Sequence, residues 1–235
     1  LVQGFSEYLP ISSSAHLVLL PRVMQTREFG LTFDVFLHAG TLFSTLVYFR
    51  KDWMDIGRSF LRSLKFKVRK PQSSIHWKHL VVATIPAVIA GLTLHQWIRS
   101  QLRGTEVIVV TLSLGGILLF LVDHFKSKRR SLKGWKLKDA LYVGFAQCFA
   151  LVPGVSRSAA TMIGGRLLGL NRKEAARFSF LMLGPVTFAA VVFELRHWSS
   201  FVSGDGVHLG PLLVAGFGSF VFGMTAIHVL SLIHI

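Results

Sequence analysis

The stretch that decides how this chain folds is Gln3-Gly-Phe-Ser-Glu7-Tyr-Leu-Pro10-Ile-Ser12-Ser13-Ser14-Ala15, because its pattern occurs twice. The second copy lies 144 residues further along and reads Gln147-Cys-Phe-Ala-Leu-Val-Pro153-Gly154-Val-Ser156-Arg157-Ser158-Ala159. Gln, Phe, two Ser and Ala align without a gap, and Pro is displaced by one position. In membrane proteins, polar and interrupted segments at matching places of two halves indicate a buried binding site.

Composition and apolar runs indicate an integral membrane protein. Hydrophobic residues make up 51% of the chain and charged residues only 16%, against about 25% in an average soluble domain. Five apolar runs are long enough, or nearly so, to cross a hydrocarbon core about 30 Å thick as helices. They are Leu31–Phe49, Leu80–Ile98, Val107–Val122, Phe178–Phe193 and Leu209–Leu230. The single cysteine excludes a disulfide framework. We therefore predict an all-α, polytopic helical bundle.

The net charge of +15 is unevenly distributed. Residues 50–78 hold nine Lys and Arg against two Asp, and residues 126–138 hold seven with no acid. Basic loops remain in the cytoplasm, so both segments are predicted to lie inside. Because they flank apolar spans and carry no recognition fold, their expected partner is anionic membrane lipid and not nucleic acid. Residues 60–66 predict a short amphipathic helix on the inner membrane surface.

This topology makes the weaker segments 1–28 and 139–171 start and end on one side of the membrane. We predict that both are re-entrant helical hairpins, the first entering from outside and the second from inside. Three spans follow the first hairpin, so the second half is inverted relative to the first. The prediction is one membrane domain, 1–235, with repeats at about 1–125 and 139–235. Because the second repeat holds two spans, we expect a further span beyond Ile235 in the native protein.

The second copy of the motif predicts a site for an anion. Gly154 lets a ligand approach the backbone, and a helix that begins near Ser156 would direct its free N–H groups at a phosphate or carboxylate. Arg157 adds a fork of donors suited to phosphate oxygens. Further hydroxyl donors are Ser158 and Thr161. Two hairpins that enter from opposite faces would bring both copies of the motif to one pocket.

The first copy supplies groups that a reaction needs. Gln3 and Glu7 are four residues apart and share one face of a helix. The Glu7 carboxylate is a candidate general base or a ligand of a divalent cation. Three hydroxyls are candidate nucleophiles: Ser12, Ser13 and Ser14. His16 follows closely, and His is the commonest base beside a nucleophilic hydroxyl.

A second pair of polar residues, Asp34 and His38, lies inside the first predicted span. These residues are also four apart and face one side of a helix. Two interpretations stay open, because such a pair either borders the pocket or makes a structural contact within the helix.

Taken together, the two motifs resemble the signature regions of the undecaprenyl-diphosphate phosphatase family of bacitracin-resistance proteins. The matching residues are Gln3-x-x-x-Glu7, Leu9-Pro10-x-Ser12-Ser13-x-x-His16 and Pro153-Gly-x-Ser-Arg-Ser-x-x-Thr161. The resemblance implies a multi-pass hydrolase of the bacterial inner membrane. Its substrate would be the lipid undecaprenyl diphosphate, and its product the monophosphate carrier used in peptidoglycan synthesis, an activity that confers bacitracin resistance.

The resemblance also implies a role for particular residues. Glu7 takes the acidic position, Ser13 that of the proposed nucleophile, His16 that of the motif histidine and Arg157 that of the phosphate-binding arginine. The expected substrate-binding residues are Gln3, Ser12, Ser14, Gly154, Ser156, Ser158 and Thr161. A dependence on Mg²⁺ or Ca²⁺ is implied, with Glu7 and Gln3 as candidate ligands, and no organic cofactor. Gln3 is an amide where the family also uses a carboxylate, which removes one half of a two-carboxylate site.

The sequence leaves two mechanisms and two functions open. Ser13 attacks with His16 as its base, or His16 and Glu7 activate water directly. The alternative function is a transporter or flippase of polyprenyl phosphate lipids, because inverted repeats with broken helices are a transporter architecture. A carrier needs the Arg157 clamp but not the group formed by Glu7, Ser13 and His16. Whether the protein forms a homo-oligomer is also open.

Overall fold

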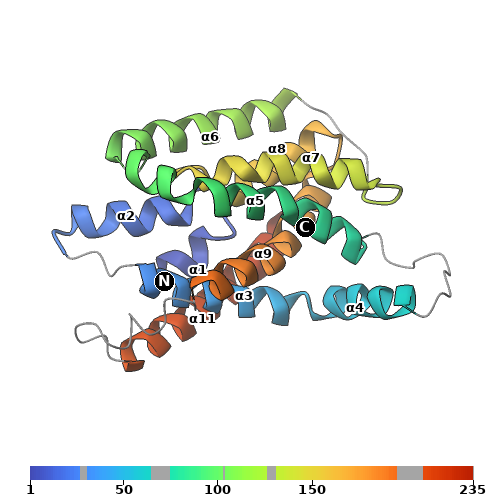
Figure 1. Ribbon diagram of the computed structural model, residues 1–235, viewed down its shortest axis with the longest axis horizontal. Helices are drawn as coiled ribbons and strands as arrows, with labels where there is room; N and C mark the ends of the chain where they lie inside the picture. Colours follow the sequence, from blue (N-terminus) through green and yellow to red (C-terminus); the bar gives the residue numbers. More distant parts are fainter. Residues whose placement is uncertain (27–30, 65–74, 103, 126–130, 195–208, 235) are drawn as a thin grey trace.

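The computed structural model describes residues 1–235 apart from 27–30, 65–74, 103, 126–130, 195–208 and 235, and the described part contains no strand (Figure 1). Its helices are α1 (Val2–Ser6), α2 (Ser13–Val23), α3 (Leu31–Tyr48), α4 (Arg50–Leu64), α5 (Trp77–Gln101), α6 (Thr105–Phe125), α7 (Leu137–Cys148), α8 (Arg157–Leu167), α9 (Arg172–Glu194) and α11 (Leu209–His234). A short 3₁₀ helix, η1 (Phe149–Leu151), follows α7. The predicted all-α class is confirmed.

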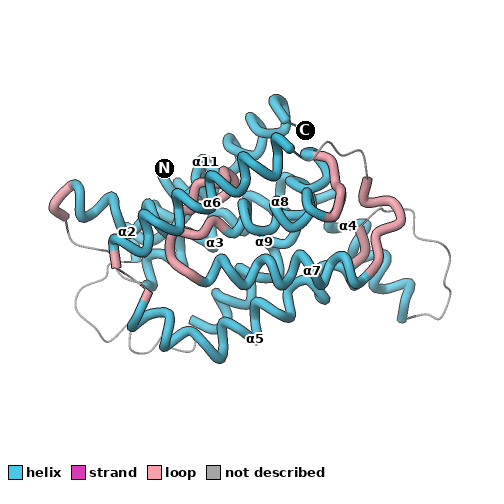
Figure 2. The backbone as a smooth tube through the Cα atoms, turned by 90° about the horizontal axis from the view of Figure 1, so that it is seen from above, coloured by secondary structure: helices cyan, strands magenta, loops and turns pink. Residues whose placement is uncertain are grey.

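All five predicted spans are helices, α3, α5, α6, α9 and α11. Four of them are long and apolar enough to cross a membrane, and α3 carries a shorter apolar stretch, Phe33–Tyr48. Half of the apolar segment of α9 is buried inside the protein, against 11% for α6. The centre of the bundle is therefore formed by α9, which packs on α3, α5 and α8, while α6 lies at the periphery (Figures 1 and 2).

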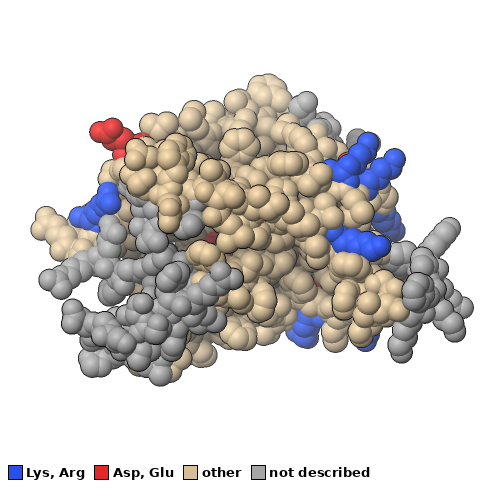
Figure 3. Space-filling view, viewed as in Figure 1, with Lys and Arg blue, Asp and Glu red and all other residues tan. Residues whose placement is uncertain are grey.

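Lys and Arg gather at one end of the bundle, the right-hand end in Figure 3. The starts of α5, α7 and α9 lie at that end in Figures 1 and 2, and they carry Lys78, Lys138 and Lys173. Helix α4, with Arg58 and Arg62, extends from the same end. The described parts of the two basic segments thus share one side, and that this side faces the cytoplasm stays a prediction from the positive-inside rule.

Helix α4 is longer than the amphipathic segment expected at 60–66. It begins at Arg50, and residues 65 and 66 lie outside the described residues. One face packs inward through Ile56, and the apolar side chains of Phe60, Leu61 and Leu64 are exposed among basic residues. This combination of an exposed apolar face and basic neighbours is typical of a helix at a membrane surface.

Two units of short helices carry the repeated motif. The first is α1–α2, joined by a turn through Pro10, and the second is α7–η1–α8, joined through Pro153. Each of these helices has twelve or fewer residues, and a span needs about 20. Helix α1 packs on α3 and α11, and α8 packs on α6, α7 and α9, so one helix of each unit is held among the longer helices. That they re-enter the membrane from opposite sides stays a prediction.

Candidate active site

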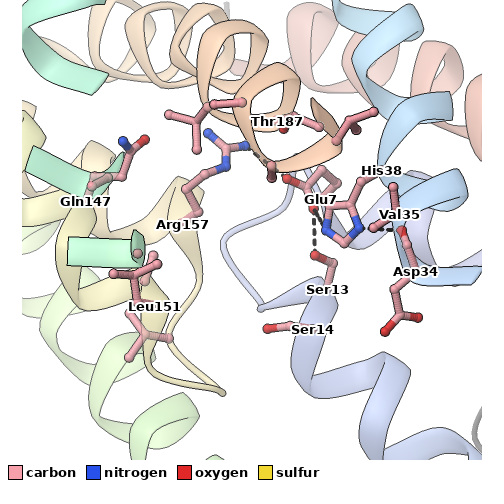
Figure 4. Close-up of a pocket in the computed structure, with 18 of the residues that line it drawn as sticks. Glu7, Ser13, Ser14, Asp34, Val35, His38, Gln147, Leu151, Arg157 and Thr187 are labelled. Carbon is pink, nitrogen blue, oxygen red and sulfur yellow. Dashed lines mark hydrogen bonds and ion pairs between the residues drawn. The ribbon is translucent and has the colours of Figure 1, made fainter. Parts of the chain in front are cut away.

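The two motif units meet at a cavity of about 490 Å³. Its polar wall comes from the turn between α1 and α2, from α3, and from the end of α7 and the start of α8. Its apolar wall comes from α5 and α9. Six residues predicted from the sequence line it: Glu7, Ser12, Ser13, Ser14, Ser156 and Arg157. Figure 4 shows Arg157 on one wall and Glu7, Ser13 and His38 on the facing wall.

The Glu7 carboxylate lies at the centre of the hydrogen-bond network. Its Oε2 accepts hydrogen bonds from Gln3 Nε2 at 3.0 Å and from Ser13 Oγ at 2.6 Å. Its Oε1 is paired with Arg157 Nη2 at 3.2 Å. The Gln3 contact confirms that the two residues share one face at the start of the chain. Only 7% of Glu7 is exposed, so these donors replace the water that an ionised carboxylate needs.

Arg157 joins the two halves of the chain. Its side chain, 14% exposed, donates from Nη1 to the Ser179 carbonyl of α9 at 3.2 Å and from Nη2 to Glu7. A second bond joins the halves where Ser158 Oγ donates to the Leu9 carbonyl at 3.0 Å. Because both partners of the Arg157–Glu7 pair are held from more than one side, their charges are fixed in position before any ligand binds.

The two copies of the motif share their local structure. Ser12 caps α2 by accepting from the Ala15 N–H, and Ser156 caps α8 by accepting from the Ala159 N–H. Each cap also contacts the serine two residues on, Ser14 or Ser158. The motifs therefore start two helices at the cavity, with Ser13 and Arg157 as their first residues. Two helix N-termini with free N–H groups favour an anion between them.

One backbone difference separates the copies. Ser12 has φ +60° and ψ 95°, whereas Ser156 has φ −73° and ψ 126°. A non-glycine residue at positive φ costs roughly 1–3 kcal/mol and is found disproportionately at functional sites. The strained residue is the one directly before Ser13.

Both interpretations that the sequence left open for Asp34 and His38 hold, because the two residues line the cavity and also contact each other within α3. His38 Nε2 lies 3.6 Å from Glu7 Oε2, and its Nδ1 bonds the Asp34 backbone carbonyl at 2.7 Å. His38 is thus an imidazole beside the central carboxylate. Sequence spacing placed the pair on one helix face but did not indicate that this face turns toward Glu7.

Five predicted site residues do not line the cavity: Gln3, His16, Gly154, Ser158 and Thr161. The Thr161 hydroxyl instead contacts Ser179 Oγ at 2.6 Å, beside the carbonyl that holds Arg157. His16 bonds the Ser12 carbonyl through Nδ1 at 2.8 Å, while the Ser13 hydroxyl donates to Glu7. Glu7 is therefore the residue positioned to accept the Ser13 proton. A role for His16 as the base stays a prediction.

The residues that the structure describes do not form a metal site of their own. No group of three or more His, Cys, Asp or Glu side chains suited to a metal ion occurs among the described residues. Glu7 already accepts from Gln3, Ser13 and Arg157, and Gln3 directs its donor nitrogen, not its oxygen, at the carboxylate. A divalent cation prefers several oxygen ligands, which this arrangement does not supply.

Chelation is accordingly expected to leave the thermal stability of the substrate-free protein unchanged. A cation that binds the folded chain raises the melting temperature once its concentration exceeds its Kd, and the described donor groups provide no such site. The measurement is the melting temperature in detergent with EDTA, with Mg²⁺ and with Ca²⁺. A rise in Mg²⁺ or Ca²⁺ that EDTA reverses and Glu7→Gln abolishes would establish a protein-held cation.

Gly154 has a packing role at the turn before α8. Its φ is +94°, and an added Cβ would lie 2.1 Å from Thr111 Oγ1 and 2.6 Å from the Ile108 carbonyl oxygen. Gly154→Ala is expected to lower the free energy of unfolding by roughly 2–4 kcal/mol, through strain and overpacking. The readout is the melting temperature in detergent. Gly57→Ala, at a position in α4 with nothing within 4 Å, is the control and should not lower it; an equal fall in both variants would contradict the prediction.

Comparison with known proteins gives one family and several similar sequences. The model of the family described as "Bacitracin resistance protein BacA" matches residues 1–234. A protein of Idiomarina loihiensis is 42% identical over 228 residues, which is 97% of this chain and 85% of that protein. One of Marinobacter nauticus is 41% identical over the same shares. One of Gemmatimonas aurantiaca is 45% identical over 195 residues, 83% of this chain and 73% of that protein. All three carry the name undecaprenyl-diphosphatase.

Proposed function

The chain belongs to the bacitracin resistance protein BacA family, and from this premise we infer that it is an undecaprenyl-diphosphatase. It is a multi-pass protein of the bacterial inner membrane that hydrolyses undecaprenyl diphosphate to undecaprenyl phosphate and inorganic phosphate. The product is the lipid carrier for peptidoglycan synthesis. The observation that carries the assignment is the Glu7–Arg157 pair, which lies beside Ser13 where the two motif units meet.

The diphosphate binds between the N-termini of α2 and α8. Arg157 offers two N–H groups in one plane, a geometry that matches two phosphate oxygens. As the phosphate takes the Nη2 donor, the Glu7 Oε1 atom loses its partner and is free to accept a proton. Substrate binding thereby frees Glu7 to act as the base. In the empty cavity the same carboxylate stays paired with Arg157.

Ser13 is the nucleophile that the geometry favours. Its hydroxyl already donates to Glu7 Oε2 at 2.6 Å, so the proton has an acceptor when Oγ attacks the terminal phosphorus. The bond from that phosphorus to the bridging oxygen breaks, and undecaprenyl phosphate leaves with the proton that Glu7 took from Ser13. Water then attacks the phosphoserine and gives a proton to Glu7. As the bond from phosphorus to Ser13 Oγ breaks, Glu7 passes that proton to Oγ, which releases inorganic phosphate and restores the Ser13 hydroxyl. Arg157 stabilises the charge on the transferring phosphoryl group in both steps.

The apolar wall of the cavity accommodates the first isoprene units. Val88 and Leu92 of α5 and Ala190 and Val191 of α9 line this part of the site. These side chains carry no charge, so a prenyl chain is the part of the substrate that gains most from binding there. The remainder of the chain extends into the surrounding lipid, which keeps the leaving group close to the protein.

The activity is tested by measuring inorganic phosphate and undecaprenyl phosphate released from undecaprenyl diphosphate by the purified protein in detergent. The matched inactive control is the double variant Glu7→Gln/Arg157→Ala, which removes the ion pair without leaving a buried unpaired charge. We expect equimolar products from the wild type and none from the control. Arms with EDTA, Mg²⁺ and Ca²⁺ test the cation dependence that the family resemblance implies.

A negative result in this assay would favour the alternative function, a transporter of polyprenyl phosphate lipids. A folded wild-type protein that releases no phosphate in any cation arm, yet moves labelled polyprenyl phosphate across proteoliposomes, would overturn the hydrolase. The names of the relatives do not favour this alternative.

A further inference from the structure

Gln147 is a buried polar side chain at the cavity that the mechanism above does not use. It is 2% exposed, lies one residue before the end of α7, and lines the cavity. Neither its Nε2 nor its Oε1 has a hydrogen-bond partner among the described residues. Figure 4 shows it on the same wall as Arg157 and opposite Ser13.

The repeat explains why this amide has no partner. Gln147 corresponds to Gln3, whose Nε2 donates to the carboxylate four residues on, Glu7. Four residues after Gln147 the chain has Leu151, which offers no acceptor. A buried amide without a partner destabilises the folded protein, so an apolar residue would suit the empty cavity better. The cost is recovered if a ligand supplies the missing partner.

We propose that Gln147 binds the lipid-side phosphate of the diphosphate, the one that leaves with the prenyl chain; this inference rests on the proposed function. The terminal phosphate must lie beside Ser13, on the facing wall. Arg157 lies between the two positions, so the other phosphate extends toward Gln147. The amide nitrogen donates to a phosphate oxygen without adding charge. Gln147 is thus a residue that selects for a second phosphate and positions the leaving group.

The test compares Gln147→Met with the wild type on undecaprenyl diphosphate. Methionine keeps the length of the side chain and removes both polar atoms. A hydrogen bond to a charged group is worth enough to raise KM roughly 10-fold or more, whereas kcat should change less than about threefold because Ser13, Glu7 and Arg157 are untouched. Gln147→Glu, which directs a carboxylate at the phosphate, should raise KM at least as much.

Product inhibition shows which of the two phosphates of the substrate Gln147 binds. The inhibition constant of undecaprenyl phosphate should rise in Gln147→Met together with KM, because that lipid carries the lipid-side phosphate. The inhibition constant of inorganic phosphate, which occupies the position beside Ser13, should not change. The reverse pattern would overturn the assignment to the lipid-side phosphate.

Thermal stability separates a ligand-binding role from a structural one. Without substrate, Gln147→Met should melt at or above the wild-type temperature, because it removes an unpartnered buried amide. The matched variant at the repeated position, Gln3→Met, loses the bond to Glu7 and should melt lower. A fall in Gln147→Met equal to that in Gln3→Met would overturn the proposal, as would an unchanged KM. Failure of the proposed function differs from both, because then the wild type itself releases no phosphate.

Discussion

Arg157→Ala is expected to lower kcat/KM for undecaprenyl diphosphate by roughly 10³- to 10⁵-fold, the range found when an arginine that stabilises phosphoryl transfer is removed. The guanidinium is held through Nη1 by the Ser179 carbonyl, a contact that remains when the phosphate takes the Nη2 donor, so the group is already in position when the reaction begins. Arg157→Lys keeps the charge but loses the planar fork, and should lose roughly 10²-fold or more. The measurement is the initial rate of phosphate release as a function of substrate concentration.

Stability has to be measured in the same variants. Removal of Arg157 leaves the buried Glu7 carboxylate without its cation, at a cost of about 3–5 kcal/mol. Arg157→Lys and the double variant with Glu7→Gln avoid that cost, so they report the loss of activity in folded protein. Arg172→Ala is the control for a lost arginine, because Arg172 pairs with Asp123 away from the cavity and its side chain is 63% exposed. A folded Arg157→Lys within tenfold of the wild type would contradict the assigned role.

The spans were predictable because hydropathy and length are local properties. The five apolar runs became helices, with ends displaced by a few residues. The largest displacement is at α9, which begins at Arg172 and not at Phe178. Asn171 accepts from the Glu174 N–H and so starts the helix among charged residues, and Arg177 pairs with Asp52 of α4. These polar turns extend the helix beyond the apolar run Phe178–Phe193 from which the span was predicted.

The site was predictable where one helix turn determines it. Gln3 and Glu7 meet because they are four residues apart, and the two cap serines follow from the motif itself. Glu7 and His38 meet because α1 packs on α3, and the sequence of neither segment predicts this packing. The sequence therefore favoured His16, the nearer histidine, whose Nδ1 is bound to the Ser12 carbonyl. Gln147 had a signal in the repeat, since it matches Gln3, but its missing partner is visible only in three dimensions.

Ser13→Ala separates the two chemical routes and should lower kcat by roughly 10⁴-fold or more if Ser13 is the nucleophile, as for other serine nucleophiles. Its hydroxyl is buried and bonded to Glu7 at 2.6 Å, so no other described hydroxyl has the same access to that base. The readout is kcat for phosphate release, together with acid-quenched protein after reaction with undecaprenyl diphosphate labelled in the terminal phosphate. We expect labelled phosphoserine in the wild type and no label in Ser13→Ala.

Glu7→Gln is the companion variant for the covalent route. It keeps the Ser13 hydroxyl and the shape of the site but removes the proton acceptor, so both the attack and the release of phosphate should slow, by roughly 10²- to 10⁴-fold. If water attacks directly, Ser13→Ala retains activity within about tenfold, because Glu7 can still act as the base, and no label is trapped in any variant. That result would leave Ser13 as a donor that orients Glu7. Because Glu7 is common to both routes, its loss is severe either way, and only the serine variant and the trapped label decide between them.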